Sequence, residues 1–241
     1  MASKCIEIVF KSDGYRLHGV LHHPNTKAPP LIAGSHGLES NGDSPKQIEL
    51  ADACCKMGFA YFRFDHRGCG QSEGVFAEVT SVENRKRDLI NAVNIIRETQ
   101  DIGIRLALFG SSMGGTTCIA AAKELNAEAY VLIAAPVYGE TLIKPPEELE
   151  SEPGLSFAFY EKFLQFDVSD NIKHMKNVLI FHGDKDDIVP VSNGKTIYEK
   201  ATEPKKIIIQ ENGDHRISDP IHQKQFLAEA STWYHKVFSP S

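Results

Sequence analysis

The sequence predicts a fold of the α/β class, in which helices cover both faces of a mostly parallel sheet. Short apolar runs of the kind that forms buried strands recur at residues 31–35, 59–64, 104–109, 129–133 and 177–181. Segments whose apolar residues repeat at helical spacing lie between several of these runs. Strands that alternate with helices in this way pair in parallel, because each helix carries the chain back to the same end of the sheet.

Composition limits the class of partner. The chain has 241 residues, 41% of them hydrophobic, and a formal net charge of −6 with no long run of either sign. Nucleic acid and anionic membranes are therefore not expected partners. The first ten residues lack the apolar core of a signal peptide, and no run is long enough to span a membrane. We expect a cytoplasmic protein, monomeric or homodimeric, that acts on a small molecule.

The cysteines indicate a reducing compartment. Their number is odd, and their positions show no paired Cys-x-x-Cys spacing. They are Cys5, Cys54, Cys55, Cys69 and Cys118. We interpret the adjacent Cys54 and Cys55 as packing residues of a helix. No cysteine stands at a strand-to-helix turn, so a catalytic cysteine is not expected.

The N-terminal segment predicts a β-hairpin. Ile6, Ile8 and Phe10 alternate with polar residues, Ser12-Asp13-Gly14 supplies a turn, and residues 15–21 extend again. After the strand at 31–35, Ser44-Pro45 predicts the start of a helix that runs to about residue 57, where Gly58 ends it.

The remaining elements follow in order. A helix begins at Ser81, with apolar residues at helical spacing through residue 96. A further helix is expected at about 192–201, a last strand at 206–209, and an amphipathic helix at about 219–237. With no internal repeat and no long linker, we expect a single domain over residues 1–241.

The regular alternation breaks between about residues 136 and 172. Prolines and an acidic run interrupt it, and several aromatic residues then follow within ten positions. Long insertions of this kind often act as lids. We expect a cap here, whose aromatic residues either anchor it to the core or contact substrate. The candidate substrate contacts are Phe157, Phe159, Tyr160 and Phe163.

The segment 106–117 predicts a reactive serine. An apolar run meets Gly110-Ser111-Ser112-Met113-Gly114, a Gly-x-Ser-x-Gly pattern, and passes at once into a small-residue helix. In such a tight turn the serine has a strained backbone conformation, and the glycines leave room for strand and helix to approach. Ser111 does not fit the spacing. Ser112 is therefore the candidate nucleophile, and the amide of Met113 would point towards a developing oxyanion.

An acid and a base follow at the ends of later strands. Acidic residues cluster at 184–187 after one strand, and His215 follows the last strand. The carboxyl ends of parallel strands share one edge of the sheet, where ligands bind. The order Ser, Asp, His is the one expected for a serine nucleophile on this architecture. His215 would take the serine proton, and an aspartate would orient the imidazole.

These motifs together resemble the α/β-hydrolase superfamily, and within it the small-capped serine esterase and serine aminopeptidase-like branch. The matching segments are the elbow at 110–114, the Asp-x-Arg-Gly-x-Gly-x-Ser loop at 65–72, His-Gly-x-x-Asp-x-x-Val-Pro at 182–190, Asp214-His215 and His36-Gly37-Leu38. The resemblance covers nearly the whole chain. It implies a twisted sheet of about eight strands with helices on both faces and a short cap.

The resemblance also implies roles for particular residues. The register at 182–190 selects Asp186 as the acid, with Asp184 and Asp187 as alternatives. The amide of Leu38 would join that of Met113 in the oxyanion hole. Many members carry His or Tyr immediately before the nucleophile, whereas this chain has Ser111, which leaves more room.

The expected function is hydrolysis of small to medium carboxylic esters through an acyl-enzyme. An acyltransferase, a thioesterase or a small peptidase would use the same triad, and a non-enzymatic binding module on the fold is a further alternative. We interpret His182 as structural and His36 as serving its own loop. No group of residues has metal-site spacing, so neither a metal nor an organic cofactor is expected.

Overall fold

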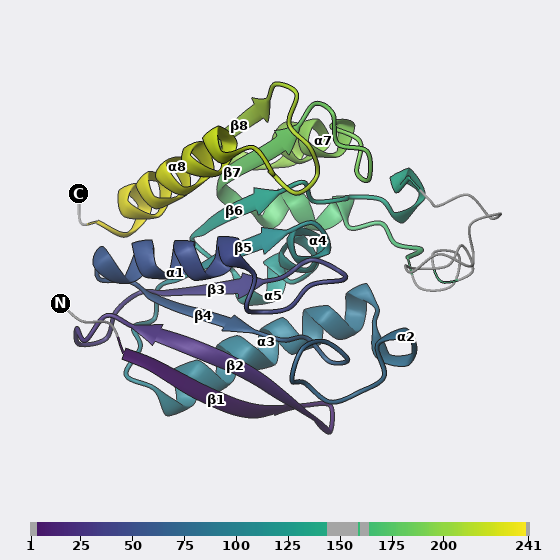
Figure 1. Ribbon diagram of the computed structural model, residues 1–241. Helices are drawn as coiled ribbons and strands as arrows, with labels where there is room; N and C mark the ends of the chain where they lie inside the picture. Colours follow the sequence, from purple (N-terminus) through teal and green to yellow (C-terminus); the bar gives the residue numbers. More distant parts are fainter. Residues whose placement is uncertain (1–3, 144–158, 160–163, 240–241) are drawn as a thin grey trace.

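The computed structural model describes residues 4–143, 159 and 164–239. One eight-stranded sheet runs through the molecule in the order β1-β2-β4-β3-β5-β6-β7-β8. The β1/β2 and β2/β4 pairs are antiparallel, and every later pair is parallel, so β2 alone runs against the others. Figure 1 shows helices on both sides of the twisted sheet. The predicted α/β-hydrolase fold is confirmed.

The strands follow the predicted apolar runs. Their bounds are β1 Lys4–Ser12, β2 Tyr15–His23, β3 Leu31–Ser35, β4 Ala60–Phe64, β5 Leu106–Ser111, β6 Ala129–Ile133, β7 Lys176–Gly183 and β8 Thr202–Gln210. The strand predicted at 104–109 begins two residues later, because the side chain of Ile104 is 89% exposed and lies outside the sheet. The last strand is longer than predicted because its outer residues are polar and lie at the sheet edge.

The helices lie in two layers (Figure 1). The α-helices are α1 Pro45–Lys56, α2 Phe76–Val79, α3 Val82–Thr99, α4 Met113–Ala120, α5 Ala122–Leu125, α7 Ser192–Lys200 and α8 Pro220–Phe238, with short 3-10 turns at η1 Gly139–Thr141 and η3 Ser169–His174. Buried residues of α1 and α8 pack on one face of the sheet. Residues of α3, α4, α5 and α7 pack on the other. In the part of the chain described, no helix is long and apolar enough to cross a membrane.

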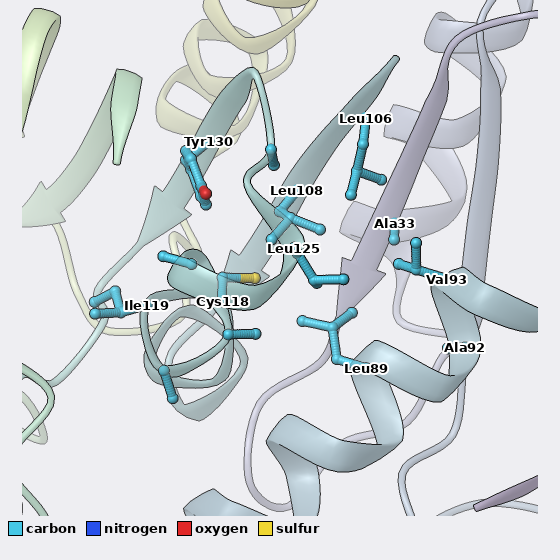
Figure 2. Packing of buried hydrophobic residues seen from close by; sticks show 14 of the residues in the cluster. Ala33, Leu89, Ala92, Val93, Leu106, Leu108, Cys118, Ile119, Leu125 and Tyr130 are labelled. Atoms are coloured by element: carbon cyan, nitrogen blue, oxygen red, sulfur yellow. The ribbon is translucent and has the colours of Figure 1, made fainter. Parts of the chain in front are cut away.

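The larger core cluster lies between the sheet and α3 and α4. Figure 2 shows Leu89 and Val93 of α3 facing Leu106 and Leu108 of β5, with Cys118 of α4 beside them. Ser81 begins α3 by accepting a hydrogen bond from the amide of Asn84, which satisfies one of the first helical donors. This packing fixes β5 and α4, the two elements that meet at Ser112.

The two described ends of the predicted cap lie side by side. Tyr138 and Asp167 form an isolated antiparallel bridge, and the amide of Gly139 donates to the carbonyl oxygen of Phe166 over 2.8 Å. The amide of Val168 donates to Val137 over 3.1 Å. Residues 137–139 therefore pair with residues 166–168 next to the end of β6.

Candidate active site

Ser112 stands on a strained turn between β5 and α4. Its backbone angles, φ 53° and ψ −124°, lie outside the usual regions for a residue with a side chain. The flanking glycines explain why the turn forms. A Cβ on Gly110 would lie 2.5 Å from the carbonyl oxygen of Gly114, and one on Gly114 would collide with the carbonyl oxygen of Ser35. Only glycine allows β3, β5 and α4 to approach this closely.

Three side chains from separate loops meet at this turn. The Nε2 atom of His215 lies 3.0 Å from Ser112 Oγ, and its Nδ1 atom lies 2.9 Å from Asp186 Oδ2 and 3.1 Å from Oδ1. Ser112 follows β5, Asp186 follows β7 and His215 follows β8, all at the carboxyl edge of the sheet. The arrangement gives the serine a base and the base an acceptor for its second ring proton.

Asp186 is held as an anion. Burial of the carboxyl raises its pKa, but hydrogen bonds with His182, His215 and the amide of Val189 outweigh burial and hold the pKa well below its usual value. The amides of Ile188 and Val189 donate to Oδ1 over 3.0 and 2.7 Å. The carboxylate is thus charged at neutral pH and oriented towards His215.

His182 is placed as a structural residue. Its Nε2 atom donates to the carbonyl oxygen of Val189 over 2.8 Å and lies 3.4 Å from Asp186 Oδ2. The imidazole is buried. It therefore supports the loop that presents Asp186 and does not reach the serine.

The loop after β3 passes over Ser112. A Cβ on Gly37 would lie 3.6 Å from the carbonyl oxygen of Ser111 and 3.7 Å from Ser112 Cβ. Leu38 follows in this loop, and Met113 begins α4, so both residues flank the nucleophile. Both also line the pocket above Ser112. Their amides remain the candidate oxyanion donors.

Arg85 supports the loop after β3 through hydrogen bonds, a role that the sequence did not lead us to predict. Its guanidinium, fully buried, donates through Nη2 to the carbonyl oxygens of His36 and Gly37. The His36 ring donates from Nδ1 to Gly37 over 2.7 Å and accepts from the amide of His66 over 3.1 Å. A signal existed in the sequence, because Arg85 shares a helical face with the apolar Leu89 and Ala92. An arginine on a buried face needs partners inside the protein.

The loop at 65–72 is structural. Asp65 accepts from the amides of Gly42 and Gln71 over 2.7 and 2.8 Å. Arg67 pairs with Asp88 of α3, with its Nη2 atom 2.6 Å from Oδ1. These contacts tie the loop after β4 to α3 and leave it outside the set of residues that meet at Ser112.

A pocket of about 580 Å³ opens above Ser112. One part of its lining is apolar and belongs to a single packed cluster with Phe159, comprising Leu38, Met113, Leu142, Leu164 and Ile188. The ring of Phe159 is buried and stacks on Phe76, with centroids 5.6 Å apart. The other predicted substrate contacts, Phe157, Tyr160 and Phe163, lie outside the described residues.

Buried cysteines of the described chain have thiols with raised pKa values. Burial raises the pKa of the Cys55 thiol to about 12, and the thiols of Cys54 and Cys118 have raised pKa values for the same reason. Within residues 4–143, 159 and 164–239, no three His, Cys, Asp or Glu side chains are grouped as a metal site.

The fold and the serine turn define a class, the serine hydrolases of the α/β-hydrolase fold. The family described as serine aminopeptidase, S33 (Hydrolase_4) matches residues 27–158, more than half of the chain. The chain therefore belongs to this family.

Individual relatives are distant. The chain is 26% identical over 220 residues to the uncharacterized protein YfhR of Escherichia coli K12, a match that spans 89% of this chain and 74% of that protein. It is 26% identical over 214 residues to the mitochondrial palmitoyl-protein thioesterase ABHD10 of Mus musculus, spanning 79% of this chain and 70% of the other.

Solved structures share the fold. Est1E of Butyrivibrio proteoclasticus, determined with ferulic acid bound, matches with a TM-score of 0.83 and 21% identity, covering 97% of this chain and all of that one. The esterase PF2001 of Pyrococcus furiosus matches with a TM-score of 0.80 and 18% identity, over 98% and 92% of the two chains.

Proposed function

We propose that the protein is a carboxylesterase that uses Ser112, His215 and Asp186 as its catalytic triad. The observation that carries the proposal is the continuous contact from Ser112 Oγ through the imidazole to Asp186, with both ring nitrogens engaged. Asp186 keeps the proton on Nδ1, which leaves the Nε2 lone pair facing the serine hydroxyl.

The reaction follows from this geometry. His215 accepts the proton of Ser112 as Oγ attacks the ester carbonyl, and the amides of Leu38 and Met113 stabilise the oxyanion. His215 then donates that proton to the leaving alcohol, and the acyl group remains on Ser112. Water attacks the acyl-enzyme with His215 again as base, and release of the acid restores the serine.

The apolar wall of the pocket supports small to medium acyl groups. Leu38, Met113, Leu142 and Leu164 give an acyl chain a surface from which water is excluded. We further propose a single domain whose cap lies at about residues 136–172. A cytoplasmic location, a monomer or homodimer, and substrate contacts from the cap remain predictions.

Turnover of 4-nitrophenyl butanoate and labelling by a fluorophosphonate test the triad. The wild-type protein should do both, and Ser112→Ala should do neither. Ser192→Ala, at an exposed position in the first turn of α7, is the matched control and should behave as wild type. Undiminished turnover in Ser112→Ala would contradict the assignment of Ser112 as the nucleophile. A wild-type protein that neither labels nor turns over would favour a binding module.

A thioesterase is the second candidate, favoured by the similarity to a palmitoyl-protein thioesterase. The same triad cleaves both bonds. Matched oxygen and sulfur esters of butanoate, with the alanine amide of 4-nitroaniline as a peptidase substrate, separate the alternatives. A kcat/KM for the thioester well above that for the oxygen ester, after correction for their rates with hydroxide, would favour the thioesterase.

A further inference from the structure

The pocket above Ser112 has a second, polar end. It is bounded by the first turn of α1, by Ser111, and by the loop and first turn that lead into α8. We call the polar end the part lined by Lys46, Gln47, Ser111, Arg216, Ser218 and Gln223. Other polar residues of the lining include Glu39, Ser40 and Ser44. Lys46 Nζ donates to the carbonyl oxygen of Arg216 over 2.8 Å, which joins α1 to the loop that carries His215.

Gln47 supplies a buried donor without a partner among the described residues. Its side chain lines the pocket although the residue is only 1% exposed. Oε1 accepts from the hydroxyl of Tyr61 over 3.2 Å, whereas Nε2 has no hydrogen-bond partner within residues 4–143, 159 and 164–239. Buried amide groups are nearly always paired, so Nε2 calls for an acceptor that the described part of the chain does not supply.

Ser111 leaves the space that such a ligand needs. Side chains alternate along β5, so Ser111 shares a face with Phe109, which packs with α1 and α8 residues. Phe109 also lines the pocket. Ser111 lines the same pocket as Ser112 and Gln47, so a small side chain at position 111 takes up little of its volume.

The charges at this end favour an anion. Lys46 and Arg216 are cationic and line the pocket. Burial lowers the pKa of Lys46 and the carboxylate of Asp214 acts against this shift, but Asp214 itself does not line the pocket. Glu39 and Arg216 are both exposed, so water screens both charges, and the half-buried Lys46 is the main cation facing the pocket.

We propose that the polar end binds the leaving alcohol of the substrate and that this alcohol carries a carboxylate. The inference rests on the proposed function. His215 must protonate the leaving oxygen, and the loop that holds His215 continues directly into Arg216 and Ser218 at the polar end. The acyl group then lies against the apolar wall. The substrate class is an ester of an apolar acid with a hydroxy acid.

Two butanoate esters test this inference, carboxymethyl butanoate and propyl butanoate, each corrected for its rate with hydroxide. The wild-type protein should favour the carboxymethyl ester by about tenfold in kcat/KM, the usual worth of a hydrogen bond to a charged group. Gln47→Leu and Lys46→Met should each lower that ratio severalfold. Gln225→Leu, an exposed position on α8 outside the pocket, should leave it unchanged.

A second variant protects the test against misfolding, because Gln47 also bonds Tyr61. Ser111→Val fills the polar end from the strand side and should also lower the ratio. Equal kcat/KM for the two esters in the wild type, with turnover lost in Ser112→Ala, overturns the inference and leaves the esterase standing.

The position of the carboxylate is tested with propyl hydrogen succinate, which carries it on the acyl side. A preference for this ester over carboxymethyl butanoate overturns the inference, because it places the anion on the wrong side of the scissile bond. No turnover of any ester, together with no fluorophosphonate labelling, overturns the proposed function and this inference with it.

Discussion

The Nε2 atom of His215 lies 3.0 Å from Ser112 Oγ, although 103 positions separate the two residues in the chain. The contact exists because β5 and β8 end at the same edge of the sheet. A turn after β8 then brings the imidazole back across β7 and β6. The distance is that of a hydrogen bond without any movement of the loops.

Asp186→Asn should lower kcat by about 10³ to 10⁴ with 4-nitrophenyl butanoate, because an amide no longer keeps the proton on His215 Nδ1. Asp184→Asn is the matched control, since Asp184 is exposed and begins the same loop. Steady-state kinetics on both variants show which of the two carboxylates acts as the acid. A large loss in Asp184→Asn with little loss in Asp186→Asn would show that the acid has been assigned to the wrong residue.

Arg85→Lys should lower kcat by about tenfold or more while KM changes little. Arg85 Nη2 donates to the carbonyl oxygens of both His36 and Gly37, and the shorter lysine side chain places its ammonium further from them. The loop that presents the Leu38 amide then loosens, and the oxyanion is less well stabilised. Arg87→Lys on the exposed face of α3 is the control. A change confined to KM, or equal effects in both variants, would contradict a positioning role for Arg85.

Much of the fold and the candidate site follows from local sequence. The apolar runs predicted the strands, and Gly110 and Gly114 predicted the turn at Ser112, because both features depend on neighbouring residues. Arg85 was missed because its partners lie almost fifty positions away. The polar end of the pocket was missed for a similar reason, since Lys46 and Arg216 meet only after α1 and the loop before α8 are placed.

Stability should fall as the pH drops below about 6.5, the pKa of an unfolded histidine. Burial lowers the pKa of His36 and of His66, the latter to about 3, and the Arg85 guanidinium lowers both further. At pH values between the folded and the unfolded pKa, the unfolded chain binds more protons than the folded protein. Each of these histidines therefore lowers the free energy of unfolding by about 1.4 kcal/mol for each pH unit that the pH falls.

Urea unfolding at pH 7.5, 6.5, 5.5 and 5.0 measures this dependence. His66→Gln should reduce the slope, whereas His174→Gln, at an exposed position in η3, should not. Below about pH 4 the carboxylates of Asp88 and Asp186 should steepen it, because the pKa of each is held below its usual value in the folded protein. A stability that stays constant from pH 7.5 to 5.0 would mean that the two histidines are not buried in neutral form.

Leu142→Trp should shift the acyl preference towards short chains. Leu142 is buried in the apolar wall of the pocket with Met113 and Leu164, and an indole there takes up space that a long acyl chain needs. The ratio of kcat/KM for 4-nitrophenyl octanoate to that for the acetate should fall about tenfold, the usual effect of changing the fit of a hydrophobic pocket. Ile221→Trp on the exposed face of α8 is the control and should leave the ratio unchanged. An unchanged ratio in Leu142→Trp would show that the acyl chain does not lie against the apolar wall.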